Sequence, residues 1–194
     1  LFYMSGNLFW GYFSACLGAG NSVFQSNVSL FSQVYFPRLI IPLAPVISKL
    51  IDFFIALILL AGMMYYFGFT PSIDIIYIPF LILLMMFTAS GLGMWFTALS
   101  IQYRDIRYSL GFGIQLLMYA SPVVYPASMV PERFRLLYNL NPVTSVIEAF
   151  RSILLSTNPI PWDGLAIGLF VSLLLSISGA VYFMSMERKF ADVV

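Results

Sequence analysis

Long uncharged stretches alternate with short charged ones along this chain. A helix needs about 20 mostly apolar residues to cross the hydrocarbon core of a bilayer. Five runs without Asp, Glu, Lys or Arg reach that length: 1–37, 53–73, 75–103, 108–131 and 164–186. We therefore predict an all-α integral membrane protein whose five visible transmembrane helices cover residues 1–19, 45–67, 75–101, 109–125 and 164–186.

The second and third spans carry local signals. Pro42 and Pro45 follow a polar stretch, and because proline interrupts a helix we expect that stretch to be a connection containing a short helix. Lys49 and Asp52 lie three residues apart near the start of the second span, which predicts an ion pair at the membrane interface. The small residues of 89–93 predict a surface on which another helix packs closely.

The charged region 127–162 differs from the rest of the chain. Asn141-Pro142 predicts a helix start, because Asn caps a helix and Pro fits its first turn. Apolar residues follow at helical spacing, with Glu148 and Arg151 three residues apart among them. This helix is short for a span and carries charges in its middle. We therefore predict short extracytoplasmic helices that lie in the interface or enter the membrane only partway.

The composition agrees with a membrane protein and excludes several kinds of site. Hydrophobic residues make up 61% of the chain and charged residues 9%, whereas soluble domains have about 45–50% and about 25%. The sequence has no His, which excludes a Ser-His-Asp triad, and Cys16 as the single cysteine excludes an internal disulfide. The net charge of +1 gives no basic surface for nucleic acid. We predict no catalytic residue and no metal site.

Positive residues near the span ends indicate the orientation. With alternating spans, one side receives Arg38, Lys49, Arg104, Arg107, Arg188 and Lys189. Positive residues gather on the cytoplasmic side, so we expect 21–44, 102–108 and the C-terminus there and 127–162 outside. The first visible span then begins outside. We therefore expect a missing N-terminal portion with one more span, six in all.

The sequence shows no site that would couple transport to an ion gradient or to ATP. Ion-coupled carriers keep ionisable groups inside the bilayer, whereas the predicted spans are nearly free of charge. A GxxxxGK[ST] nucleotide loop is also absent from the sequence. If the chain transports, we expect a separate ATPase to drive it through the cytoplasmic connections at 25–38 and 102–108.

Five motifs resemble those of type-2 ABC permeases that export polysaccharides. They are Tyr35-Phe36-Pro37-Arg38, Tyr103-Arg104-Asp105, the run ASPVVYP at 120–126, Asn141-Pro142 with Arg151, and the ERKFAD ending at 187–192. Each motif is short, but the five cover the visible chain in the order that the family has them. The interface helix and the first span of that family are not seen before Leu1.

The resemblance implies a function and an assembly. The protein would be the transmembrane permease subunit, not an enzyme, of an ATP-driven exporter of a lipid-linked polysaccharide such as O-antigen, capsule or teichoic acid. Its single domain would pair with a second copy of itself and with a cytoplasmic ABC ATPase subunit, which would hold ATP and Mg²⁺. This chain would then have no cofactor of its own. The C-terminal motif resembles O-antigen exporters most, which favours the inner membrane of a Gram-negative cell.

Three groups of site residues follow from the motifs. The residues expected to contact the ATPase are Tyr35, Phe36, Pro37, Arg38, Tyr103, Arg104 and Asp105. The resemblance implies that the short helices before the last span form an extracytoplasmic gate, with Pro122, Asn141, Pro142, Glu148 and Arg151. Aromatic faces can stack on sugar rings, and the candidates for a conduit lining are Phe9, Tyr12, Tyr119 and Tyr125. The alternative for each group is a structural role as loop anchor, surface ion pair or helix packing.

Two other functions stay open. A type-2 ABC permease for a drug or a lipid would share the architecture, and a large extracellular insert or a fused ATPase would favour it. A membrane-embedded glycan transferase would need acidic or His groups at the cytoplasmic face, whereas Asp74, Glu148 and Asp163 are predicted outside.

Overall fold

The structure is a computed structural model that describes residues 1–26, 39–69, 72–131, 134, 138–155 and 159–190. Its regular elements are helices: α1 (Phe2–Ser26), α2 (Ile40–Tyr66), the 3₁₀ helix η2 (Ile73–Tyr77), α3 (Ile78–Gln102), α4 (Arg104–Ala120), the 3₁₀ helix η3 (Ala127–Met129), α6 (Pro142–Leu155) and α7 (Trp162–Phe190). The predicted all-α class is confirmed. The second short helix expected over 131–140 falls largely outside the described residues.

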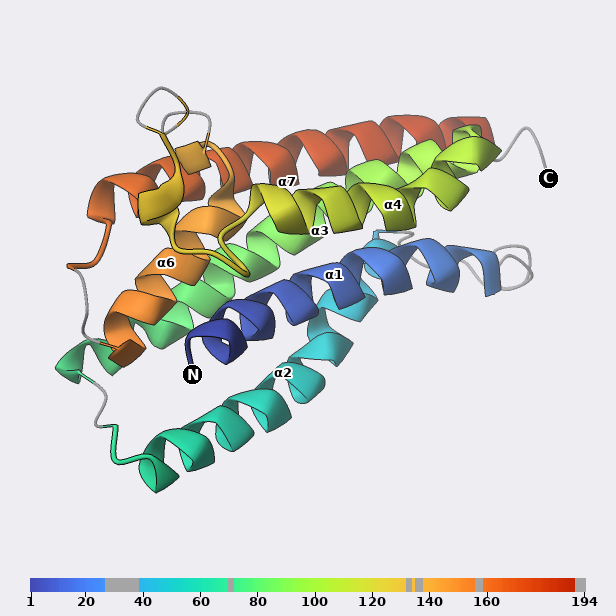
Figure 1. The fold of residues 1–194 in the computed structure, drawn as a ribbon. Helices are drawn as coiled ribbons and strands as arrows, with labels where there is room; N and C mark the ends of the chain where they lie inside the picture. Colours follow the sequence, from blue (N-terminus) through green and yellow to red (C-terminus); the bar gives the residue numbers. More distant parts are fainter. Residues whose placement is uncertain (27–38, 70–71, 132–133, 135–137, 156–158, 191–194) are drawn as a thin grey trace.

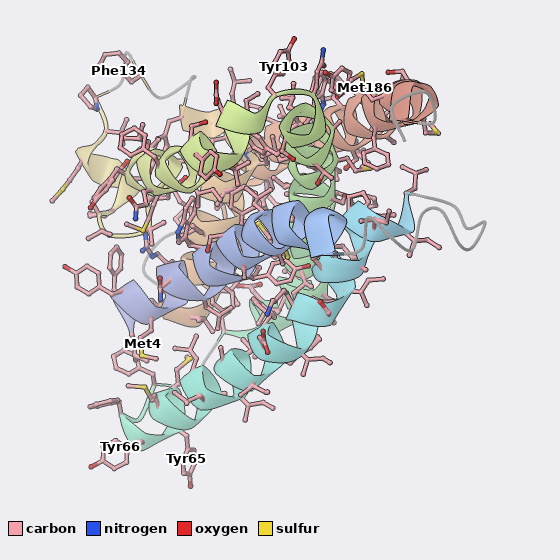
Figure 2. The ribbon with its side chains drawn as sticks, turned by 90° about the vertical axis from the view of Figure 1, so that its right-hand side faces the viewer. Met4, Tyr65, Tyr66, Tyr103, Phe134 and Met186 are labelled. Atoms are coloured by element: carbon pink, nitrogen blue, oxygen red, sulfur yellow. The ribbon has the colours of Figure 1, made fainter. Side chains whose placement is uncertain are left out.

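The long helices run back and forth between two ends of the molecule (Figure 1). One end holds the start of α2, the junction of α3 with α4 and the C-terminal end of α7. The other end holds the N-terminus, η2 and α6. Figure 2 shows Tyr103 and Met186 near each other at the first end, and Tyr65 and Tyr66 at the far end of α2. These two ends hold the segments that the sequence predicts on opposite sides of the membrane.

Three of the described helical segments are long and apolar enough to cross a membrane. They are Ile40–Tyr66, Ile73–Ser100 and Trp162–Met186, which correspond to the second, third and fifth predicted spans. The first and fourth predicted spans fall on α1 and α4, and their crossing stays a prediction. α4 is the shortest of the five long helices, with 17 residues.

The second helix begins earlier than the sequence indicates. α2 starts at Ile40, five residues before the predicted start at residue 45, so the expectation that Pro42 belongs to a connection was wrong. Pro42 lies in the first turn, where a backbone N–H has no helical partner to lose. Pro45 lies inside the helix beside α1, where the Tyr12 hydroxyl donates to the Val46 carbonyl at 2.7 Å. Contacts with α1 therefore stabilise a turn that proline disfavours.

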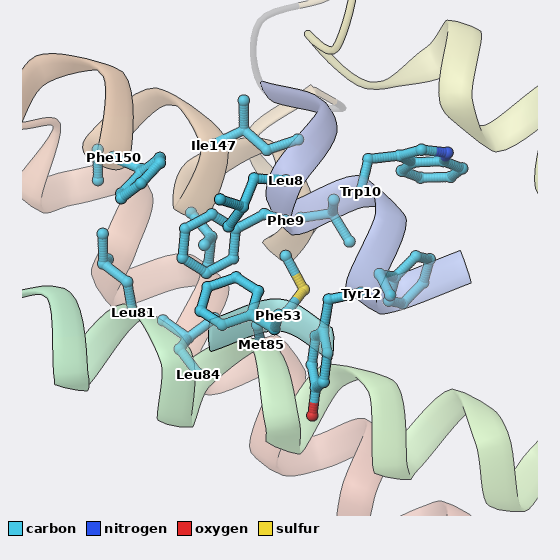
Figure 3. Close-up of a cluster of buried hydrophobic side chains, with 14 of the residues drawn as sticks. Leu8, Phe9, Trp10, Tyr12, Phe53, Leu81, Leu84, Met85, Ile147 and Phe150 are labelled. Atoms are coloured by element: carbon cyan, nitrogen blue, oxygen red, sulfur yellow. The ribbon is translucent and has the colours of Figure 1, made fainter. Parts of the chain in front are cut away.

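Aromatic side chains join α1, α2 and α6 into one core (Figure 3). The ring of Phe9 is fully buried, with its centroid 5.1 Å from that of Phe53 and 4.8 Å from that of Phe150. Both pairs meet edge to face, the arrangement that aromatic quadrupoles favour. Leu81 and Leu84 of α3 complete the cluster. This core fixes α6 against the long helices.

Helices α3 and α7 touch through their backbones. A Cβ on Gly91 would lie 2.6 Å from the backbone carbon of Leu175, and a Cβ on Gly179 would lie 2.6 Å from the Gly91 carbonyl oxygen. Both distances are too short for a real side-chain atom, so each position requires glycine. We call this contact of Gly91 with Gly179 and Leu175 the seam. It confirms the close-packing surface predicted at 89–93.

Candidate functional site

Asn141 caps the helix that follows it. Its Oδ1 accepts a hydrogen bond from the backbone N of Val143 at 3.1 Å, and Pro142 is the first residue of α6. An N-cap side chain satisfies one of the N–H groups that a helix start leaves unpaired, and proline has no N–H to leave unpaired there. The helix start predicted from Asn141-Pro142 is confirmed.

The same side chain joins α6 to the end of α4. Asn141 Nδ2 donates to Ser121 Oγ at 2.9 Å, and this hydroxyl donates to the Leu117 carbonyl, also at 2.9 Å. α4 ends at Ala120, five residues before the predicted end of the span. Ser121 is extended, as expected of a residue before the buried Pro122. The predicted break at Pro122 is therefore present, and it turns the chain toward α6.

Arg151 makes a second link between α6 and the segment after α4. Its side chain is only 6% exposed. Nη2 donates to the Val123 carbonyl at 2.7 Å, and Nη1 donates to the Tyr125 carbonyl at 3.4 Å. The guanidinium carbon also lies 3.8 Å from the ring centroid of Phe2, a cation–π contact with α1. We call the links of Asn141 to Ser121 and of Arg151 to Val123 and Tyr125 the clamp.

Gly6 makes room for the clamp on α1. A Cβ at this position would overlap the guanidinium of Arg151 and would lie 2.8 Å from the Val123 carbonyl oxygen. Gly6 itself is buried. A side chain here would push α1 away from both groups, so the close approach of α1 depends on glycine.

Electrostatics at Arg151 combine burial with a nearby acid. Burial lowers the pKa of Arg151, while Tyr138 and Glu148 act in the opposite direction. An arginine stays protonated at neutral pH despite such a shift. The buried Nε of Arg151 has no hydrogen-bond partner among the residues that the structure describes. The charge of Glu148 counteracts the effect of burial on the pKa of Arg151, and the expected role of this pair in a gate stays a prediction.

A polar cleft of about 570 Å³ borders the clamp. Its walls include Glu148, Arg151, Tyr138, Asn139 and Asp163. The cleft therefore collects carboxylate, guanidinium, phenol and amide groups at the end of the molecule that the sequence places outside.

Two of the four aromatic residues predicted to line a conduit lie in the core instead. Phe9 is fully buried and Tyr12 is 5% exposed. Both rings pack against Phe53 of α2, and the Tyr12 hydroxyl is bonded to the Val46 carbonyl. The expectation that they face a conduit is corrected, because α1 buries this face between its own neighbouring helices.

Of the other two aromatic candidates, Tyr119 lies at the C-terminal end of α4 and Tyr125 lies in the segment after it. Tyr119 is 66% exposed, and the half-buried Tyr125 donates its hydroxyl to the Tyr119 carbonyl at 2.9 Å. Tyr108 and Phe112 of the same helix are 71% and 64% exposed. α4 thus carries an exposed aromatic face. The conduit role of Tyr119 and Tyr125 stays a prediction.

The structure describes only part of the residues expected to contact an ATPase. Tyr35, Phe36, Pro37 and Arg38 lie outside the described residues, as does the side chain of Arg104. Tyr103 and Asp105 are exposed. The charged loop expected over 102–108 is reduced to the single residue Tyr103, which is extended between α3 and α4. Asp105 lies in the first turn of α4, where a negative charge favours the helix start.

The whole chain is similar to known proteins. Residues 1–155 match the family described as ABC-2 type transporter. The chain is 25% identical over 197 residues to the O-antigen export system permease protein RfbA of Klebsiella pneumoniae, with 100% of this chain and 75% of the relative covered. An RfbA protein of Myxococcus xanthus is 26% identical with the same coverage. The matched regions include the clamp as well as the long helices.

Proposed function

The chain belongs to the ABC-2 type transporter family, and we propose that it is the permease subunit of an exporter that moves a lipid-linked polysaccharide across the bacterial inner membrane. It is a multi-pass membrane protein and a transport component that works with an ABC ATPase. The observation that carries the substrate class is the similarity of the whole chain to three O-antigen export permeases.

The exposed face of α4 supports a paired permease. Gln115 and Leu116 are exposed on this helix beside Tyr108 and Phe112. Gln115 lies within the helix, five residues before its end at Ala120, where contact with lipid is unfavourable for an amide. We propose that a second copy of the chain lies opposite this face and that Tyr119 and Tyr125 line the conduit between the copies.

The ATPase would act at the end of the molecule that holds Tyr103. We propose that this end and the C-terminus are cytoplasmic. Tyr35, Phe36, Pro37 and Arg38 with Tyr103, Arg104 and Asp105 would meet the ATPase, which alone would hold ATP and Mg²⁺. The exposure of Tyr103 and Asp105 supports this placement.

The clamp would hold an outer gate. We propose that α6 closes the extracytoplasmic end while Asn141 and Arg151 keep their bonds to the segment after α4. Pro122 and Pro142 support this gate by fixing where α4 ends and α6 begins. Glu148 would contribute by its charge beside Arg151.

Deletion of the gene tests the proposed function. We expect the strain to lose long-chain surface polysaccharide on a gel and to accumulate the polymer inside the cell. The native gene should restore the pattern, and a copy carrying Arg38→Ala at the same protein level should not. An unchanged polysaccharide pattern together with hypersensitivity to amphiphilic drugs would instead favour a drug or lipid permease.

A further inference from the structure

A charged pair lies on the surface of α2 far from its ends. Lys49 Nζ is 2.9 Å from Asp52 Oδ2, which confirms the predicted ion pair. The two side chains are 36% and 66% exposed. They are the tenth and thirteenth residues of a helix of 27 residues. Because α2 starts at Ile40 and not at residue 45, the pair lies nearer the middle of the helix than the sequence indicates.

The position of the pair relative to the neighbouring helix α1 is a second indication of its depth in the membrane. A groove of about 260 Å³ runs between α1 and α2, and it is lined by Lys49 and Asp52 together with Asn7, Gly11 and Tyr12. Gly11 and Tyr12 lie near the middle of a helix that runs from Phe2 to Ser26, and Asn7 lies about one turn nearer its N-terminus. If α1 and α2 both cross the bilayer, these positions would place the groove deeper in the membrane than the interface that the sequence predicts.

Lipid would solvate the charged pair on this face of the molecule poorly. Charged side chains within a membrane span almost always face the interior of a bundle or a water-filled cavity, because hydrocarbon does not solvate them. A lysine can extend its ammonium group toward the interface. Here, however, the hydrogen bond keeps Nζ at the carboxylate of Asp52, which has a much shorter side chain. The exposed pair must therefore meet water or another polar surface.

We propose that the groove between α1 and α2 is a water-exposed wall of the export pathway, in which the Lys49–Asp52 pair contacts the hydroxyl groups of the passing glycan. This inference rests on the proposed function for the identity of the ligand. Its first claim, that the groove is wet, concerns only the chain and the membrane.

The chemistry of the groove suits a sliding neutral polymer. The ammonium group donates hydrogen bonds and the carboxylate accepts them, so the pair can meet a sugar hydroxyl in either role. The pair has no net charge and does not select for a charged glycan. Asn7, which is exposed, adds an amide to the lining of the groove. The small size of the groove, about 260 Å³, favours weak contacts that are made and broken in turn.

Cysteine accessibility tests whether the groove is wet. Cys16, the single and buried cysteine, is first replaced by Ala in the full-length permease with its ATPase in membrane vesicles. Ala56→Cys then places a thiol in the groove. Ile58→Cys is the matched control, because Ile58 is 72% exposed and points about 200° away around the same helix. A charged methanethiosulfonate reagent reacts with the thiolate, which forms in water and is disfavoured in apolar surroundings.

We expect the cysteine at position 56 to react at least about ten times faster than the one at position 58. Equally slow reaction at both positions would overturn the proposal, because it would show that lipid or another protein segment covers the groove.

Paired substitutions test the contact with the glycan. Lys49→Met with Asp52→Leu removes every donor and acceptor and leaves no unpaired charge. We expect this variant to export polysaccharide about threefold to tenfold more slowly at normal protein level, as the loss of about one hydrogen bond predicts. Lys49→Gln with Asp52→Asn keeps a donor and an acceptor and should export at nearly the native rate.

Native export by the Met/Leu variant would overturn the contact with the glycan. Loss of export by both pairs alike would also overturn it, because it would show that the charges serve the fold. If deletion of the gene leaves the surface polysaccharide unchanged, the proposed function fails while the accessibility result still decides whether the groove is wet.

Discussion

Two contacts between helices in this protein are built in opposite ways. At the seam, α3 and α7 meet backbone to backbone through Gly91 and Gly179, with no space for a single added carbon. At the clamp, α6 meets the segment after α4 through the side chains of Asn141 and Arg151. The seam depends on shape, and the clamp depends on directional hydrogen bonds.

The difference indicates which part of the molecule can move. At the seam the backbones of the two helices are in close contact. A close-packed interface of this kind resists gradual change. The hydrogen bonds of the clamp end on the carbonyl groups of Val123 and Tyr125 and on the Ser121 hydroxyl, which water can solvate once the segments separate. We therefore expect the seam to act as a frame and the clamp as the part that can open.

The largest effect is expected from breaking the clamp at Arg151. Arg151→Met removes the donors to Val123 and Tyr125 and leaves both carbonyl groups without that partner. Hydrogen bonds to charged groups contribute about 1.5–3 kcal/mol, so we expect a loss of about 3 kcal/mol in stability and a loss of export. The thermal unfolding midpoint of the purified permease–ATPase complex measures the first, and the surface polysaccharide measures the second.

Arg151→Lys sharpens this result. Lysine keeps the charge but lacks the planar fork that reaches two acceptors at once. We expect an intermediate midpoint and export below the native level. If the lysine variant matched the native protein in both measurements, charge alone would explain the contact and the bridging geometry would be irrelevant.

The next effect concerns the seam and has an internal control two residues away. Gly91→Ala places a Cβ 2.6 Å from the backbone of α7, whereas Gly93→Ala places a Cβ where no atom lies within 4 Å. Overpacking costs about 1–3 kcal/mol, while replacing glycine by alanine in a free helical position gains up to about 1 kcal/mol. We expect the midpoint to fall for Gly91→Ala and to hold or rise for Gly93→Ala. Equal shifts would contradict the steric origin of the seam.

A smaller effect is expected at Asn141, which has two separate roles. Asn141→Ala removes both the helix cap and the bond to Ser121, and the loss of a cap costs about 1 kcal/mol. Asn141→Asp keeps an acceptor for the cap and loses the Nδ2 donor. We expect the Asp variant to recover most of the stability but not the export. Recovery of both would show that the link to Ser121 has no part in function.

The sequence predicts those features that depend on near neighbours. Helical class, the start of α6 at Asn141-Pro142 and the break at Pro122 follow from local rules of capping and proline geometry. The small residues at 89–93 predict a close contact, although the sequence does not say which helix would fill it. The structure supplies the partner, α7 at Gly179.

Features that depend on distant partners are not visible in the sequence. Phe9 and Tyr12 lie on an aromatic helix, and nothing local distinguishes a face turned toward α2 and α6 from one turned toward a conduit. The acceptors of Arg151 are backbone carbonyl groups 28 and 26 residues away, and a carbonyl carries no sequence signal. In the sequence, Glu148 is the more evident partner of Arg151, because the two residues lie three apart at helical spacing. The sequence shows Gly6 as one of several small residues of α1, but it gives no sign of the contact with Arg151.

The smallest effect separates shape from polarity at a contact of α3 with α7 beside the seam. Trp95 Nε1 donates to Ser178 Oγ at 3.1 Å, and the Trp95 ring stacks on Tyr182 with centroids 4.4 Å apart. Ser178→Ala removes the acceptor and keeps the stacked rings. Because this contact is only partly buried and the glycines set the distance between the helices, we expect a loss of about 0.5 kcal/mol, the low end for a hydrogen bond. A fall in the unfolding midpoint as large as that of Gly91→Ala would show that the packing of α3 on α7, like the clamp, depends on its polar contacts.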